Sequence, residues 1–176
     1  MKNVLLPTDL SVQSLWPIHE IIKENNDGKV SILVTHMVSL PTSISDLLTL
    51  SYDKFYRSMP NTFTEAFQML CHKYKSSVQT MQFRFIYCNT TRYLKNFIEG
   101  HNIDKVYLLS NYSYTLPFSQ SVNFVSFFNK SKLPVHNIPL LKDVSEYQNL
   151  SVLLNNNDTY KISGPSRLAK STVSYL

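Results

Sequence analysis

Apolar and polar residues alternate in blocks along the first 140 residues, and the blocks predict strands and helices in turn. Short apolar runs, typical of buried parallel strands, occupy residues 2–7, 30–37 and 105–109. Residues 81–87 alternate between apolar and polar, which predicts a half-exposed strand at a sheet edge. A shorter run at 135–138 predicts a fifth strand.

In the segments between these strands, apolar residues recur at the spacing of an α-helix. An apolar face predicts a first helix from Ser11 or Ser14 to about Glu24. If Ser14 is the cap, Pro17 lies in the first turn at little cost; otherwise the helix is kinked there. A later helix is predicted to start at residues 62–65, which have the form of a capping box. Its apolar positions are Phe63, Phe67, Leu70, Cys71, Tyr74 and Val78.

Two further helices complete the alternation. Asn89 or Thr90 is expected to cap a helix that ends at Gly100, and residues 117–130 are expected to form the last helix. The resulting βαβαβαβαβ order predicts an open, doubly wound α/β fold with a parallel sheet.

Composition narrows the function classes. A length of 176 residues suggests one domain with an extension, and the net charge of +5 is scattered rather than clustered. This charge could attract an anionic ligand, but without a basic run it argues against nucleic-acid binding. Neither a signal peptide nor an apolar run of about 20 residues is found. With only two cysteines, we expect a cytoplasmic protein that does not bind membranes.

Four segments, in order, resemble the universal stress protein family between residues 2 and 140. The sequence NVLLPTDLS resembles the first strand of that family and its Asp-x-Ser turn, and VSILVTHMV resembles its second strand. Further on, NIDKVYLLS is similar to its fourth strand, and SVNFVSFFNKSKLPVHNI is similar to its last helix and its closing Pro-Val strand. The resemblance implies a Rossmann-like sandwich with strand order 3-2-1-4-5. It also implies ATP binding in many members and homodimers that pair through the last strand.

The sequence departs from that family at the loop that binds phosphate. ATP-binding members carry Gly-x2-Gly-x9-Gly-Ser/Thr after the fourth strand, because backbone N–H groups must approach phosphate closely. This chain has three glycines, none of them in that loop. Ser110 replaces the first glycine and Gln120 the third, and Pro117 removes a backbone donor. We therefore expect ATP binding to be weak or absent, with Tyr112, Tyr114 or Phe118 in the crevice.

Six positions match family positions that bind nucleotide: Thr8, Asp9, Met37, Ser110, Ser121 and Val122. Asp9 matches a residue near the base and ribose, yet with Ser11 it could equally stabilise only the turn. Thr8 and Met37 match the adenine side, or they pack at strand ends. Ser121 could donate to phosphate at a helix N-terminus, or be an ordinary polar residue. Ser110 and Asn111 could form a partial anion nest.

Catalytic and metal signatures are not found. The sequence holds no Gly-x-Ser-x-Gly elbow, HEXXH or Walker loop. The spacing of Cys71, His72, Cys88 and His36 does not suit a metal site, and His36 is interpreted as a core histidine. Among the aromatic residues of the last helix, Phe124 and Phe127 are a surplus. They could mark a contact surface or fill a pocket in place of nucleotide, or they could belong to the core, as such a stripe more often does. We expect no enzymatic activity.

The domain boundary is placed between residues 141 and 142. Residues 142–176 form an extension in which LSVLL and TYKIS flank an Asn-rich turn, which predicts a β-hairpin arm. The combined prediction is a universal stress protein-like binding or interaction module of the stress response, dimeric through the last strand. The alternative is a sensor that binds a nucleotide or small anion at the carboxyl ends of the first and fourth strands.

Overall fold

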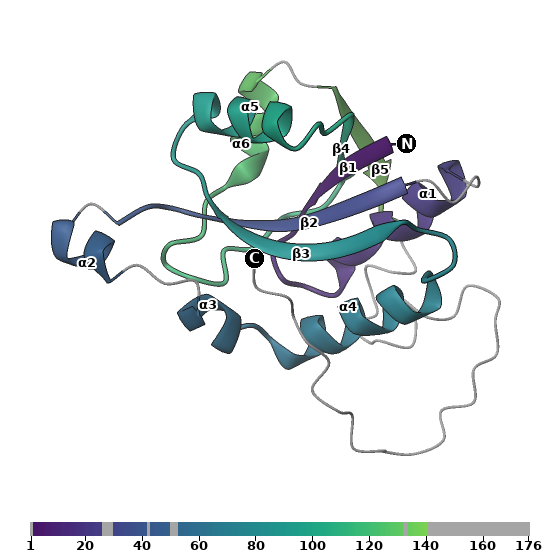
Figure 1. Ribbon diagram of the computed structural model, residues 1–176, viewed down its shortest axis with the longest axis horizontal. Helices are drawn as coiled ribbons and strands as arrows, with labels where there is room; N and C mark the ends of the chain where they lie inside the picture. The colour runs from purple at the N-terminus through teal and green to yellow at the C-terminus, as the bar shows by residue number, and fades with distance from the viewer. Residues whose placement is uncertain (1, 26–29, 42, 50–52, 132–133, 141–176) are drawn as a thin grey trace.

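The five strands form one parallel sheet in the order β3-β2-β1-β4-β5 (Figure 1). The computed structural model describes residues 2–25, 30–41, 43–49, 53–131 and 134–140. The strands are β1 (Lys2–Pro7), β2 (Val30–Val38), β3 (Thr80–Tyr87), β4 (Lys105–Ser110) and β5 (Val135–Pro139). Leu5 of β1 lies beside Leu33 of β2 and Val106 of β4. The predicted fold class and strand order are confirmed, and β3 is an edge strand as expected.

Helices cover both faces of the sheet. They are α1 (Pro17–Glu24), α2 (Ile44–Leu48), α3 (Asp53–Arg57), α4 (Asn61–Lys73), α5 (Thr91–Gly100) and α6 (Phe124–Ser131). In Figure 1, α5 and α6 lie on one side of the sheet and α4 lies on the other. None of the helices in the described ranges is long and apolar enough to cross a membrane.

The central strand contributes to two apolar cores because successive side chains point to opposite faces. Val4 and Leu6 belong to the core that also holds Phe63 of α4. Leu5 belongs to the core that holds Phe124 and Phe128 of α6. The uninterrupted apolar run of β1 is therefore explained by burial on both sides.

The first helix begins later than its apolar pattern suggests. A single 3-10 turn, Gln13–Leu15, precedes it, and Trp16 is its N-cap residue. Pro17 is the first residue of α1, where a proline removes no helical hydrogen bond. The predicted start at Ser11 or Ser14 is wrong, and Pro17 starts the helix.

The capping box predicted at residues 62–65 is also wrong. Helix α4 begins at Asn61, its N-cap position is Pro60, and no side chain caps it. The helix starts after Pro60 because a proline disfavours the helical conformation in the residue before it, so the helix cannot extend toward the N-terminus. By contrast, the cap of α5 is confirmed, since the Thr90 hydroxyl accepts from the Tyr93 N–H at 3.1 Å.

The last helix begins seven residues later than predicted. It begins at Phe124, and the preceding segment binds the end of β2 instead. The Ser39 N–H donates to the Gln120 carbonyl (2.7 Å), and the Val122 N–H donates to the Met37 carbonyl (3.0 Å). These long-range bonds compete with helix formation. As a result Phe124 is a buried core residue and not a surplus contact residue.

Two predictions fall outside the described residues. The hairpin arm expected within residues 142–176, and its packing on the domain or on a second subunit, stay predictions.

Candidate site at the carboxyl ends of β1 and β4

The turn after β1 is held in an unusual backbone conformation. Thr8 and Asp9 are buried, and Leu10 has a φ of 64°. A left-handed residue other than glycine costs about 1–2 kcal/mol, so neighbouring contacts must maintain it. The Leu10 N–H donates to the Thr8 hydroxyl at 3.0 Å, and that hydroxyl also contacts Ser14. Thr8 therefore fixes the turn that presents Asp9.

The carboxylate of Asp9 accepts hydrogen bonds at both oxygens. Its Oδ1 accepts from the Ser11 N–H (3.1 Å) and the Ser11 hydroxyl (2.6 Å). Its Oδ2 accepts from the Tyr112 hydroxyl (2.9 Å), the Thr115 N–H (2.8 Å) and the Thr115 hydroxyl (3.2 Å). Asp9 thus binds its own turn and also a loop more than 100 residues later in the chain.

These bonds compensate a buried charge that forms no ion pair in the described part of the chain. Asp9 is 1% exposed, and none of the ion pairs found there involves it. A buried carboxylate is tolerated when several donors replace its water. Burial raises the pKa of the Tyr112 hydroxyl, and the nearby charge of Asp9 raises it further. Tyr112 therefore stays protonated and donates to Asp9.

The loop after β4 is folded inward. Asn111 has a φ of 56°, which asparagine tolerates better than most residues, as the sequence suggested. Beyond it, the Tyr114 hydroxyl accepts from the Leu109 N–H at 2.7 Å, and its ring packs edge-on against Tyr112. Burial raises the pKa of Tyr114 to about 12. Two tyrosines therefore anchor the loop, one to β4 and one to Asp9.

His36 connects the turn to the segment before α6. Its Nδ1 lies 2.7 Å from the Thr8 carbonyl, which only accepts, so this nitrogen carries the proton. Its Nε2 then accepts from the Ser121 hydroxyl at 2.9 Å, while the Ser121 oxygen accepts from the Phe118 N–H at 3.0 Å. Burial lowers the pKa of His36, although the Thr8 carbonyl and the Asp9 charge oppose this shift.

The six predicted residues divide into three groups. His36 connects Thr8 to Ser121, and Asp9 follows Thr8 in the same turn without a hydrogen bond to His36 among the described contacts. Met37 is fully buried, and its carbonyl accepts from Val122, whose side chain packs against the same core. Ser110 ends β4 beside Pro139 and forms no bond with Asp9 among the described contacts. Ser121 does not lie in the first turn of a helix as predicted, because α6 begins at Phe124 and Ser121 bridges to Val38. Its predicted bond to a phosphate stays a prediction.

Sequence reasoning did not find Thr115. Its two bonds to Asp9 join positions 106 residues apart, and no local spacing predicts such a pair. Tyr112 was expected in the crevice and does contact Asp9, while the expected Phe118 packs against the His36 ring.

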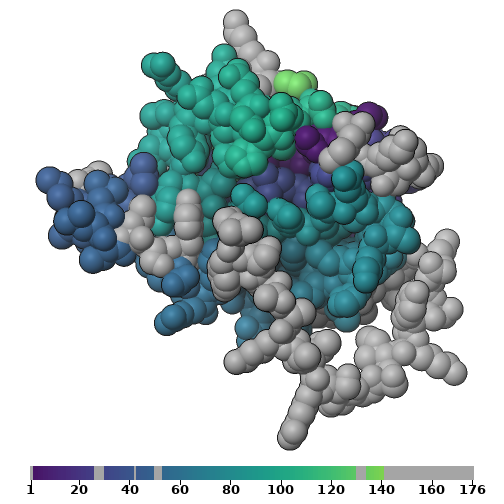
Figure 2. Space-filling view, viewed as in Figure 1, coloured from purple at the N-terminus to yellow at the C-terminus, as the bar shows by residue number. Residues whose placement is uncertain are grey.

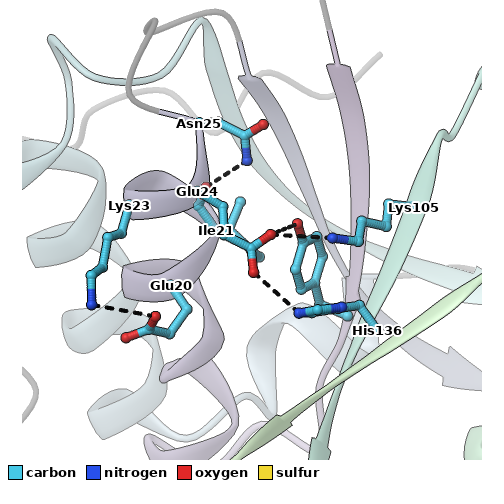
Figure 3. A network of polar contacts seen from close by, with 8 residues as sticks. Glu20, Ile21, Lys23, Glu24, Asn25, Lys105 and His136 are labelled. Atoms are coloured by element: carbon cyan, nitrogen blue, oxygen red, sulfur yellow. Dashed lines mark hydrogen bonds and ion pairs between the residues drawn. The ribbon is translucent and has the colours of Figure 1, made fainter.

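A second polar cluster lies at the opposite end of β4 (Figure 3). Glu24, the last residue of α1, binds Lys105 (3.1 Å), the Tyr107 hydroxyl (2.7 Å) and His136 (3.1 Å). Burial alone would raise the pKa of Glu24, but the bonds from Tyr107 and Lys105 outweigh it and lower the pKa. This cluster fastens α1 to β4 and β5 and does not contact Asp9.

The described residues include no group of three metal-ligating side chains close enough to hold an ion.

Comparison with known proteins finds similar structures but no similar sequence. No protein-family model matches, and neither does any curated protein. The universal stress protein UspA from Lactobacillus plantarum has 14% identity and a TM-score of 0.49, with 78% of this chain and 97% of that chain covered. A universal stress protein family member from Burkholderia pseudomallei has 10% identity and a TM-score of 0.47, with 78% and 96% covered.

A family member from Arabidopsis thaliana, with AMP bound, has 17% identity and a TM-score of 0.45, with 81% of this chain and 94% of that chain covered. Likeness at this level does not carry an argument about function. The fold assignment rests on the observed strand order, which defines a doubly wound α/β protein.

Proposed function

We propose that this protein is a universal stress protein-like binding module whose nucleotide crevice is filled by its own loop. The observation that supports this most strongly is the set of hydrogen bonds that the Asp9 carboxylate accepts. The carboxylate has five donors from Ser11, Tyr112 and Thr115. A nucleotide hydroxyl could reach Asp9 only after displacing donors that are already bound.

The part of the crevice where nucleotide phosphates would lie supports the same proposal. Residues 110–122 contain no glycine, so the backbone cannot approach a triphosphate as a glycine loop does. The Ser121 hydroxyl already binds His36 and Phe118. ATP binding would therefore require rearrangement both at Asp9, on the side of the base and ribose, and at Ser121, on the side of the phosphates.

The proposed activity is binding to another protein chain and not catalysis. The module acts in the cytoplasm, in a stress response, and it neither transfers nor hydrolyses a substrate. Its first partner is a second copy of the chain, paired through the edge of β5 that faces away from β4. Two observations support these proposals: the sequence has no catalytic motif, and no described strand other than β4 pairs with β5.

The alternative function is a nucleotide or small-anion sensor at Thr8, Asp9 and Ser121. The donors on Asp9 favour it, because the Tyr112 and Thr115 hydroxyls are chemically similar to ribose hydroxyls. In such a sensor the ligand would replace the loop, and displacement of the loop would be the signal.

Thermal unfolding with millimolar ATP and magnesium separates the two functions. A ligand present at a hundred times its Kd stabilises the native state by about 2.7 kcal/mol. For a chain of this length that would raise Tm by roughly 5–11 °C. We expect a shift well below this range. A full shift that Asp9→Ala or Ser121→Ala abolishes would establish the sensor and overturn the filled-crevice proposal.

A further inference from the structure

A groove of about 230 Å³ lies on the sheet face that carries α5, over the amino-terminal halves of β2 and β3. Ser31, Leu33, Gln82, Arg84, His101 and Ile103 contribute to its lining. Figure 2 shows purple and blue atoms of the first two strands between teal segments of the chain. The groove is at the opposite end of the strands from Asp9, so it is independent of the function proposed above.

The groove exists because helices cover this face of the sheet only in part. Met81, Phe83 and Phe85 of β3 point to the face covered by α4, where they pack in the core. The alternate residues Gln82 and Arg84 point to the α5 face and are exposed. A parallel sheet is normally covered on both faces. Because β3 is an edge strand, this face of it stays partly open and carries polar side chains.

The polar groups of the groove have unused hydrogen-bonding capacity. The oxygen of the Ser31 hydroxyl is shielded from solvent and has no partner among the described residues. Arg84 forms one long bond, 3.4 Å to the Gln82 side-chain oxygen, and no ion pair with any described carboxylate. The residues that line the groove include no Asp or Glu.

We propose that this groove binds the oxyanion of a small molecule, a phosphate or a carboxylate group. The Arg84 guanidinium, a planar fork of donors suited to both anions, would bind two of its oxygens. The Ser31 hydroxyl, whose oxygen is shielded without a ligand, would rotate toward the ligand, donate to it and thereby gain the partner it lacks. Leu33 and Ile103 would contact the apolar part of the molecule. A volume of about 230 Å³ suits a ligand smaller than a nucleotide.

Backbone amide NMR of the full chain tests this site with two probes, inorganic phosphate and acetate, at constant ionic strength. We expect saturable shifts centred on Ser31, Gln82 and Arg84 with at least one probe, and the probe that saturates identifies the class of oxyanion. Arg84→Gln should weaken binding at least tenfold. Ser31→Ala should weaken it severalfold.

Arg57→Gln is the matched control, because Arg57 is an exposed arginine of α3 outside the groove. It should leave the affinity unchanged. The amide spectrum of each variant also reports whether the fold is intact. The proposal is overturned if neither probe saturates, if the shifts centre elsewhere, or if a folded Arg84→Gln variant binds as tightly as the unsubstituted protein.

Discussion

Asp9 is where local and long-range interactions of the chain meet. Its turn position and its bond to Ser11 follow from the sequence Thr-Asp-x-Ser after a strand, and both are present. Its bonds to Tyr112 and Thr115 depend on how the loop after β4 folds back. Sequence reasoning identified the acceptor and one donor, but it could not identify Thr115, because tertiary packing alone brings the two residues together.

His36 predicts a pH dependence of stability. Burial lowers its pKa from the usual 6.5. The unfolded chain therefore takes up a proton near pH 6.5 while the folded chain does not. Between the two pKa values the unfolded state binds more protons, so the free energy of unfolding falls as pH falls. One such group contributes a slope of at most about 1.4 kcal/mol per pH unit.

Denaturant unfolding between pH 7.5 and pH 5 measures this slope. His36→Gln should flatten the profile, because glutamine does not titrate. His101→Gln serves as the control: His101 is exposed, and its replacement should leave the profile unchanged. If the His36 variant and the unsubstituted protein lose stability in parallel, the burial of a neutral His36 is not the cause.

At the scale of elements, strands were predicted more accurately than helix starts. The strand limits predicted from apolar runs agree with the structure to within one residue, because burial on both sheet faces imposes an unmistakable pattern. The start of α6 was misplaced because two backbone hydrogen bonds override local helical spacing: Gln120 accepts from Ser39, and Val122 donates to Met37. The apolar periodicity of a segment does not reveal such competing partners.

The edge of β5 leads to a prediction about assembly. Leu140 donates to Ser110, and Val106 donates to Pro134. Since bonding alternates along a parallel strand, the Asn137 N–H points away from β4, toward the edge with which no described strand pairs. An unpaired edge invites pairing with another chain. We expect a homodimer that Asn137→Pro weakens at least tenfold, because proline removes this outward donor.

Sedimentation equilibrium over a range of concentrations provides the measurement. Asn137→Ala keeps the N–H and should dimerise like the unsubstituted protein, which separates edge pairing from loss of the side chain. A monomer at the highest concentrations, or a dimer that Asn137→Pro leaves intact, would contradict pairing through β5.

On the scale of the whole molecule, the strand order is that of an open, doubly wound α/β sheet. In such sheets ligands bind outside the carboxyl ends of the strands, where the strand order reverses. Here this position, between β1 and β4, is occupied by the loop that joins β4 to α6 through Tyr112 and Thr115. The order of the strands was predicted from the resemblance, and the absence of glycine from residues 110–122 is visible in the sequence. The contacts by which the loop occupies the site were not.

A crystal structure grown with millimolar ATP and magnesium tests the filled crevice most directly. We predict density for the Tyr112 hydroxyl within hydrogen-bond distance of the Asp9 carboxylate, and no nucleotide density at the carboxyl ends of β1 and β4. Nucleotide density at that position, with Tyr112 and Thr115 displaced from Asp9, would contradict the account.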